Sequence, residues 1–246
     1  MKRIISDKKN LLILLLGILS LIAAQQAGLE FIIWILGGIL ACSLWDFLIN
    51  KLFLKRKISF KSAIITGFII SGILDYHQSW LTLIILSLAA IGSKYILRFR
   101  KKHIFNPANF GLFLAAIFKL PLTWQIESNI YLIIIAGAYL AYSFKKIPQV
   151  ISFLVFFGGL FSLIKINPLN LINWFFLSVM LIEPKTSGYG LVKGSIFGAV
   201  AAIACFLIYK FSLGTSLFIT ALVIANLFNI ISDIIRINKS EVRNAA

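Results

Sequence analysis

Long apolar runs, each close to the length that crosses a bilayer as a helix, follow one another along nearly the whole chain. A hydrocarbon core about 30 Å thick requires about 20 helical residues at a rise of about 1.5 Å each. The third, fifth and eighth runs are short or interrupted by polar groups, which is typical of discontinuous membrane helices. The sequence therefore predicts an all-α polytopic membrane protein with about ten transmembrane helices. The runs are 11–28, 30–50, 61–76, 79–97, 105–122, 129–144, 147–165, 171–184, 189–210 and 214–236.

The charged residues indicate how these runs are oriented. The chain is 60% hydrophobic and 13% charged, whereas soluble domains are about half apolar and a quarter charged. The formal net charge of +16 arises from short basic clusters between the runs. With a cytoplasmic N-terminus, all Lys and Arg residues except Lys119, Lys165 and Lys210 fall at inner helix ends, as the positive-inside rule requires. We expect a multi-pass protein of the cell membrane with both termini in the cytoplasm. Its partner is then the lipid bilayer, and nucleic acid is excluded.

The first apolar run has two interpretations. It follows a charged head at residues 1–10, and the small residues Ala23 and Ala24 could form a weak signal-peptide cleavage site. We expect the run to be retained, because its removal would leave nine crossings instead of ten.

An internal repeat is indicated by two dipeptide pairs. Ala108-Asn109 recurs as Ala225-Asn226 after 117 positions, and the same offset aligns Thr66-Gly67 with Glu183-Pro184. An odd number of helices in each repeat would invert the second one. We therefore expect one membrane domain, residues 1–246, built from inverted five-helix repeats at 1–125 and 126–246.

The first polar interruption is Asn106-Pro107. Asn at an N-cap accepts hydrogen bonds from first-turn amides, and Pro suits the first helical position, so the pair predicts a helix start. A start within the membrane would direct the positive helix end towards an anionic or carbonyl-bearing ligand. Asn109 lies one turn further on. The alternative is an interfacial cap followed by an asparagine that packs between helices.

The second interruption spans residues 181–188 and contains Glu183, Pro184 and Thr186. A carboxylate within the membrane is costly and suggests a function. The alternative is a loop acid at the interface, paired with Lys185. Asn226 belongs to a polar stripe on the last helix, which must face protein or water.

Other polar residues have structural interpretations. Thr66 is typical of hydroxyls that bond back to the preceding helical turn. We expect Asp233 to pair with Arg236, and His103 to be a solvated residue of a basic loop. No catalytic motif is present, and the two cysteines, Cys42 and Cys205, lack the spacing of a metal site. We therefore assign no catalytic or metal-binding residue.

Several segments, in order, resemble one family of membrane proteins. This family comprises the NqrB subunit of the sodium-translocating NADH:quinone oxidoreductase and the RnfD subunit of the Rnf electron-transport complex. The first half contributes Thr66-Gly67, Gly92-Ser93-Lys94 and HIFNPANFGL at 103–112. The second half contributes the segment from Phe175 to Ser187, KGSIFGA at 193–199, and the helix from Ala225 to Arg236. The resemblance covers roughly residues 60–238.

This resemblance implies a ten-helix inverted-repeat fold, related in shape to urea and ammonium channels, that works in ion-coupled membrane electron transfer. Members of the family hold flavin, including FMN esterified to a threonine of a Ser-Gly-Ala-Thr type motif. The corresponding segment here, 119–129, lacks that motif. We therefore expect noncovalent flavin, as FMN or riboflavin, rather than covalent FMN.

The first hypothesis is thus a membrane subunit of a flavin-linked, ion-coupled electron-transport complex, with other membrane or redox subunits as partners. Its flavin would lie between the two repeats. The second hypothesis is a small-solute or ion transporter or channel on the same scaffold, and the third is an assembly factor without a ligand. The candidate cofactor-binding residues are Thr66, Asn106, Asn109, Glu183, Thr186 and Asn226.

Overall fold

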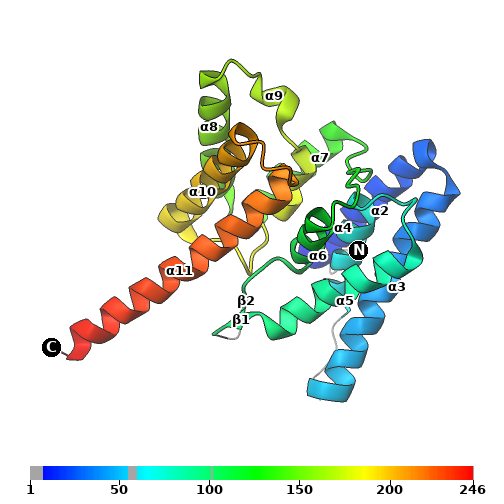
Figure 1. Ribbon diagram of the computed structural model, residues 1–246, viewed down its shortest axis with the longest axis horizontal. Helices are drawn as coiled ribbons and strands as arrows, with labels where there is room; N and C mark the ends of the chain where they lie inside the picture. Colours follow the sequence, from blue (N-terminus) through cyan, green and yellow to red (C-terminus); the bar gives the residue numbers. More distant parts are fainter. Residues whose placement is uncertain (1–7, 55–59, 101, 246) are drawn as a thin grey trace.

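The protein is built almost entirely of helices. The computed structural model describes residues 8–54, 60–100 and 102–245, and 76% of the protein is helical. Figure 1 shows helices from both halves of the chain side by side, with one end of the last helix projecting from the body. The predicted all-α class is therefore confirmed.

The described residues of the first half form five α-helices and a short hairpin. The hairpin lies between the fourth and fifth of these helices, and its two strands pair Arg98 with His103 and Phe99 with Lys102. The elements are α2 (Lys8–Ala27), α3 (Leu29–Leu48), the π-helix η1 (Ile49–Leu54), α4 (Lys61–Ile73), α5 (Trp80–Ile96), β1 (Arg98–Phe99), β2 (Lys102–His103) and α6 (Pro107–Ile117).

The described part of the second half follows a similar sequence of elements without a hairpin. Its third helical segment is a short α-helix followed by a separate π-helix, so the chain here is discontinuous, as expected from the sequence. The elements are α7 (Ile130–Ser143), α8 (Ile147–Leu163), α9 (Pro168–Leu171), η2 (Phe176–Met180), α10 (Gly190–Lys210) and α11 (Leu217–Ala245).

Four helices in the described part of the chain are long and apolar enough to cross a membrane: α2, α3 with its π-helical extension, α10 and α11. The helices α4 to α8 are also apolar but have only 10–17 residues. Each of the ten apolar runs in the sequence overlaps one of the helical elements, although α2 begins before its run and α11 continues past its own. By length and composition, only four of the helices qualify as membrane spans in the part of the chain that the structure describes. The ten-span inverted repeat therefore stays a prediction.

One predicted span is longer than the helix that forms. The run 105–122 yields α6, which ends at Ile117 because the backbone turns at Phe118 and Lys119, the latter with a left-handed φ of 56°. The apolar residues beyond this turn pack against α4 instead, where Leu122 forms a bridge with Leu74. At about 1.5 Å per residue, the 11 residues of α6 cover only about half of a hydrocarbon core.

Close helix contacts in both halves depend on glycine. A Cβ atom at Gly67 would lie 2.6 Å from the Cα of Ile39, so α4 and α3 approach each other with little space between their backbones. A Cβ atom at Gly198 of α10 would overlap the backbone carbonyl of Gln149 in α8. Small residues at such crossings are typical of membrane helix pairs.

Candidate functional site

The polar interruption after η2 forms a loop, residues 181–189, that Pro184 prevents from continuing as a helix. Glu183 is the centre of its hydrogen bonds. Its Oε1 lies 3.2 Å from Nε2 of His103, and its Oε2 accepts a hydrogen bond of 2.8 Å from the hydroxyl of Thr186. The hydroxyl of Ser187 donates to the backbone carbonyl of Glu183 at 2.5 Å. Both oxygens of this carboxylate therefore have partners.

His103 connects the two halves of the chain at this point. It belongs to strand β2 of the first half, and only 6% of its surface is exposed. The interpretation of His103 as a solvated residue of a basic loop is therefore wrong. Glu183 does not form an ion pair with Lys185, because the β1–β2 hairpin brings the histidine to the carboxylate instead.

The loop 181–189 is also held by side chains from neighbouring helices. The ammonium of Lys146 donates to the backbone carbonyls of Ser187 and Gly188 at 3.2 and 2.7 Å, and its Nζ lies 3.8 Å from the centre of the Tyr189 ring. The amide of Asn229 in α11 donates to the carbonyl of Thr186 at 3.0 Å. These hydrogen bonds fix the conformation of the loop, although it contains no helix or strand.

Lys146 lies in the turn before α8 and is 1% exposed. Burial lowers the pKa of its ammonium from 10.5 to about 8, against a smaller opposing effect of Glu183, and Lys102 lowers it further. The neutral amine retains two N–H donors, which equals the number of carbonyls it bonds. Loss of its proton above pH 8 is therefore compatible with the same loop structure.

We expect Lys146 to make the protein more stable as the pH rises from 8 to 10.5. In this window the unfolded lysine binds a proton that the folded one has lost, so the free energy of unfolding increases with pH. The gain is at most about 3.5 kcal/mol, from about 1.4 kcal/mol per pKa unit. Thermal unfolding in detergent at pH 7.5 and pH 10 measures it as the difference between the wild type and Lys146→Met. Equal pH dependence in the two proteins would contradict the assignment.

The structure brings three of the six candidate residues to one cavity. Thr66, Asn106 and Glu183 line a space of about 140 Å³, which we call the junction cavity because α4 and α6 of the first half form it together with the 181–189 loop. Thr66 donates to the carbonyl of Ser62 at 2.9 Å, as expected for a hydroxyl that bonds back to its own helix. Thr186 lines a different, neighbouring cavity.

Asn106 begins α6 as predicted. Its side-chain oxygen accepts from the backbone N–H of Asn109 at 3.3 Å, and Pro107 occupies the first helical position. The first-turn amides of α6 therefore lie beside the junction cavity, which Asn106 and Pro107 both line.

Asn109 and Asn226 line neither of these two cavities. Both are completely buried. The amide of Asn109 donates to the carbonyl of Ile219 at 3.0 Å and so connects α6 to α11. The oxygen of Asn109 and both polar atoms of Asn226 have no partner among the described residues. Asn109 therefore lies at the contact between the halves, and Asn226 is buried in α11; neither residue lines the junction cavity.

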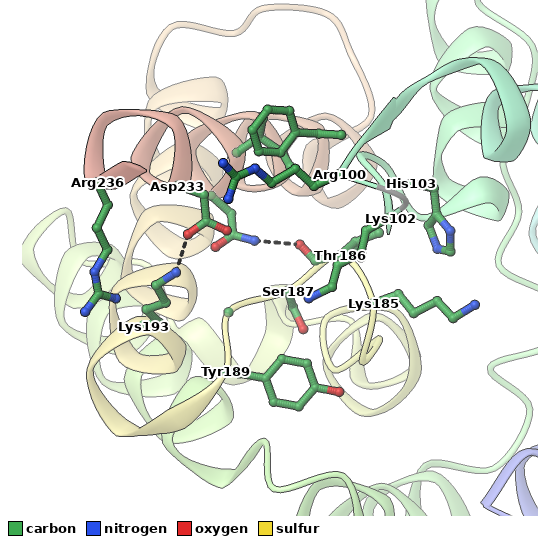
Figure 2. A pocket seen from close by; sticks show the side chains of 14 residues that line it. Arg100, Lys102, His103, Lys185, Thr186, Ser187, Tyr189, Lys193, Asp233 and Arg236 are labelled. Atoms are coloured by element: carbon green, nitrogen blue, oxygen red, sulfur yellow. Dashed lines mark hydrogen bonds and ion pairs between the residues drawn. The ribbon is translucent and has the colours of Figure 1, made fainter. Parts of the chain in front are cut away.

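The neighbouring cavity that Thr186 lines has a volume of about 400 Å³ and is shown in Figure 2. We call it the basic cavity, because five cationic side chains and one carboxylate line it. The carboxylate is Asp233, which pairs with Lys193 and not with Arg236 as predicted. Lys185 lines both cavities. The five cationic residues are Arg100, Lys102, Lys185, Lys193 and Arg236.

The two cavities present cationic, amide and hydroxyl groups, which can bind anionic or carbonyl-bearing ligands. In the described ranges 8–54, 60–100 and 102–245, no three His, Cys, Asp or Glu residues lie together as a metal site would need. Comparison with known proteins adds no assignment: no protein-family model matches the chain, and a search of curated proteins found no match.

Proposed function

We propose that the chain is an integral membrane subunit of a flavin-linked, ion-coupled electron-transport system and holds a noncovalent flavin at the junction cavity. The observation that carries this proposal is that one cavity gathers Thr66, Asn106 and Glu183 from both halves of the chain. These residues belong to the segments whose order resembles the electron-transport family. Other redox subunits would supply and accept the electrons.

The inverted repeat belongs to the same proposal. Helix α2 packs on α7, and α6 packs on α11, so two helices each contact their counterpart in the other half. Contacts between counterparts are expected where a pseudo-twofold axis relates two repeats. The remaining apolar helices would then complete ten membrane spans, with the basic loops on the cytoplasmic side.

The lining of the junction cavity has the chemistry that a flavin ring needs. Apolar side chains, including Ile65, Ile69 and Phe144, form its walls. Asn106 can donate to a ring carbonyl, and Glu183 can accept from the ring N–H. Lys185 adds a positive charge, which favours a reduced, anionic ring. A bound flavin would supply one- or two-electron transfer, and the chain itself would position it and exclude water.

The absorption spectrum of the detergent-purified protein tests this proposal. We expect a flavin band near 450 nm that moves to the supernatant after acid precipitation. Glu183→Gln should lower the flavin content several-fold, because it replaces the carboxylate that would accept from the ring N–H and that His103 contacts. The matched change at the exposed Glu30 should not lower it. Flavin retained in the pellet would show covalent attachment. A protein without flavin, from cells supplied with riboflavin, would refute the proposal.

A second candidate is a transporter for a small solute or ion on the same scaffold. The observation that favours it is the size of the junction cavity, which is about 140 Å³. Pockets that bind drug-sized organic ligands usually have volumes of about 300–1,000 Å³. A flavin ring would require α4 or the 181–189 loop to move outwards. Solute uptake into proteoliposomes by flavin-free protein would favour this candidate.

A further inference from the structure

The basic cavity has more positive charge than its own carboxylate can neutralise. Lys193 pairs with Asp233, but Arg100, Lys102 and Arg236 form no ion pair within the part of the chain that the structure describes. Figure 2 shows Arg100 and Lys102 on one side of the Lys193–Asp233 pair and Arg236 on the other. Such a concave cluster of cations concentrates anions.

Lys185, on the 181–189 loop, is a fourth cation of this cavity that forms no ion pair with a described residue. Burial lowers the pKa of its ammonium, and so do the nearby charges of Lys9 and Lys94. Glu183 partly opposes this lowering. Neither Lys9 nor Lys94 lines the basic cavity, so Lys185 adds positive charge only where this cavity borders the junction cavity. Arg100 and Arg236 have the planar guanidinium that binds phosphate oxygens in pairs.

An apolar groove adjoins the basic cavity between α10 and α11. It has a volume of about 470 Å³ and shares Lys193 and Arg236 with the basic cavity. Its other walls include Val192, Ile196 and Phe228, whose exposed fractions are 69%, 46% and 42%. A charged cavity beside an apolar groove matches the two parts of a phospholipid, which are a charged headgroup and an apolar acyl chain.

We propose that one anionic phospholipid binds here, with its phosphate headgroup in the basic cavity and an acyl chain in the groove between α10 and α11. Basic pockets between membrane helices bind phosphate headgroups on the side where the basic loops lie. A soluble phosphate ester would use the cavity alone, whereas a lipid uses both parts. The site shares Thr186 and Lys185 with the residues considered for flavin, but the Arg100, Lys102 and Arg236 cluster and the groove do not depend on the flavin proposal.

Native mass spectrometry of the detergent-purified protein, titrated with dioleoyl phosphatidylglycerol, tests the proposal. We expect saturable binding of one lipid, at least tenfold tighter than that of dioleoyl phosphatidylcholine, which has the same chains. Equal binding of the two lipids would overturn the role of the basic cavity. In separate experiments, glycerol phosphate and inorganic phosphate are added to the protein, and their binding is measured from the rise in its thermal unfolding temperature. Either one binding as tightly as the lipid would show a soluble phosphate ligand instead.

Charge variants locate the headgroup. The double change Arg100→Gln and Lys102→Gln should weaken phosphatidylglycerol binding about 30-fold, from about 1 kcal/mol for each basic residue near an anionic lipid. Both residues are exposed, so folding should persist. The matched control is Lys119→Gln with Lys165→Gln, which removes two exposed cations outside the cavity. Equal weakening in both double variants would mean a nonspecific charge effect and overturn the site.

A groove variant separates the lipid chain from the headgroup. Ile196→Gln should weaken phosphatidylglycerol binding several-fold and leave the effect of inorganic phosphate unchanged. Unchanged lipid affinity in this variant would overturn the assignment of the groove. All these readouts are independent of flavin, so a colourless protein that binds the lipid would refute the proposed function and leave this inference intact.

Discussion

Gly198→Val is expected to destabilise the protein by about 3 kcal/mol or more, because the added atoms meet backbone rather than a movable side chain. A Cβ atom at this position would overlap the carbonyl of Gln149 and lie 3.0 Å from the backbone nitrogen of Phe153. No rotamer change can relieve that contact, so α10 and α8 must separate. The separation also displaces the turn before α8, where Lys146 holds the 181–189 loop.

Thermal unfolding in detergent measures the effect, and a fall of about 6–12 °C corresponds to 3 kcal/mol for a chain of this size. Gly159→Val is the matched control, since this glycine lies in the interior of α8 and a Cβ atom there meets nothing within 4 Å. The control should unfold within about 2 °C of the wild type. Valine has a higher helix propensity than glycine, so helix propensity cannot cause a fall in either variant. An equal fall in both variants would show that the effect is not specific to the crossing of α8 and α10.

Lys146→Met is expected to lower the free energy of unfolding by about 2 kcal/mol and to loosen the 181–189 loop. The change leaves the carbonyls of Ser187 and Gly188 without their donor, at about 1–3 kcal/mol for each buried group that stays unpaired. It also removes the contact of the ammonium with the Tyr189 ring, worth about 1 kcal/mol. Removal of a buried charge offsets part of this loss, so the expected net destabilisation is smaller than the sum of the separate contributions.

The matched control is Lys145→Met, at the exposed neighbouring residue. Hydrogen exchange of peptides from residues 181–189 distinguishes loop opening from global unfolding. Exchange should increase there at pH 7 in Lys146→Met and stay unchanged in the control. If the loop of Lys146→Met exchanges as slowly as that of the wild type, other contacts hold the loop closed without Lys146, such as that of Asn229 with Thr186.

The positions of the helices could be predicted because their signals are local. Apolar runs of suitable length overlap the helical elements, and the pair Asn106-Pro107 begins α6 because capping involves only nearby amides. The predicted end of that helix was wrong. Apolarity continues past Lys119, but Leu122 forms a bridge with Leu74 at the end of α4, and this bridge requires a turn and not a longer helix.

The candidate site could be predicted only in part. Glu183, Thr66 and Asn106 were selected as polar groups in apolar surroundings, and they do line one cavity. The same criterion selected Asn109 and Asn226, which lie elsewhere, because polarity within an apolar run does not indicate which face of the helix meets which neighbour.

The partners of Glu183 and of the loop carbonyls were missed. Nothing in the sequence distinguishes the buried Lys146 from the exposed Lys145, or His103 from the basic residues before it. Their roles depend on contacts with residues about 40 and 80 positions away along the chain.

The sequence by itself determined that the protein is helical and apolar, which segments form helices, and that its basic residues cluster near the ends of the apolar runs. These properties follow from the hydrophobicity, capping and charge of neighbouring residues. The tertiary structure decided that His103 faces Glu183, that Lys146 bonds the 181–189 loop, and that the cations form a cavity beside an apolar groove. Those contacts join residues far apart in the chain, and their energies depend on distance and burial, which only the packing of the helices specifies.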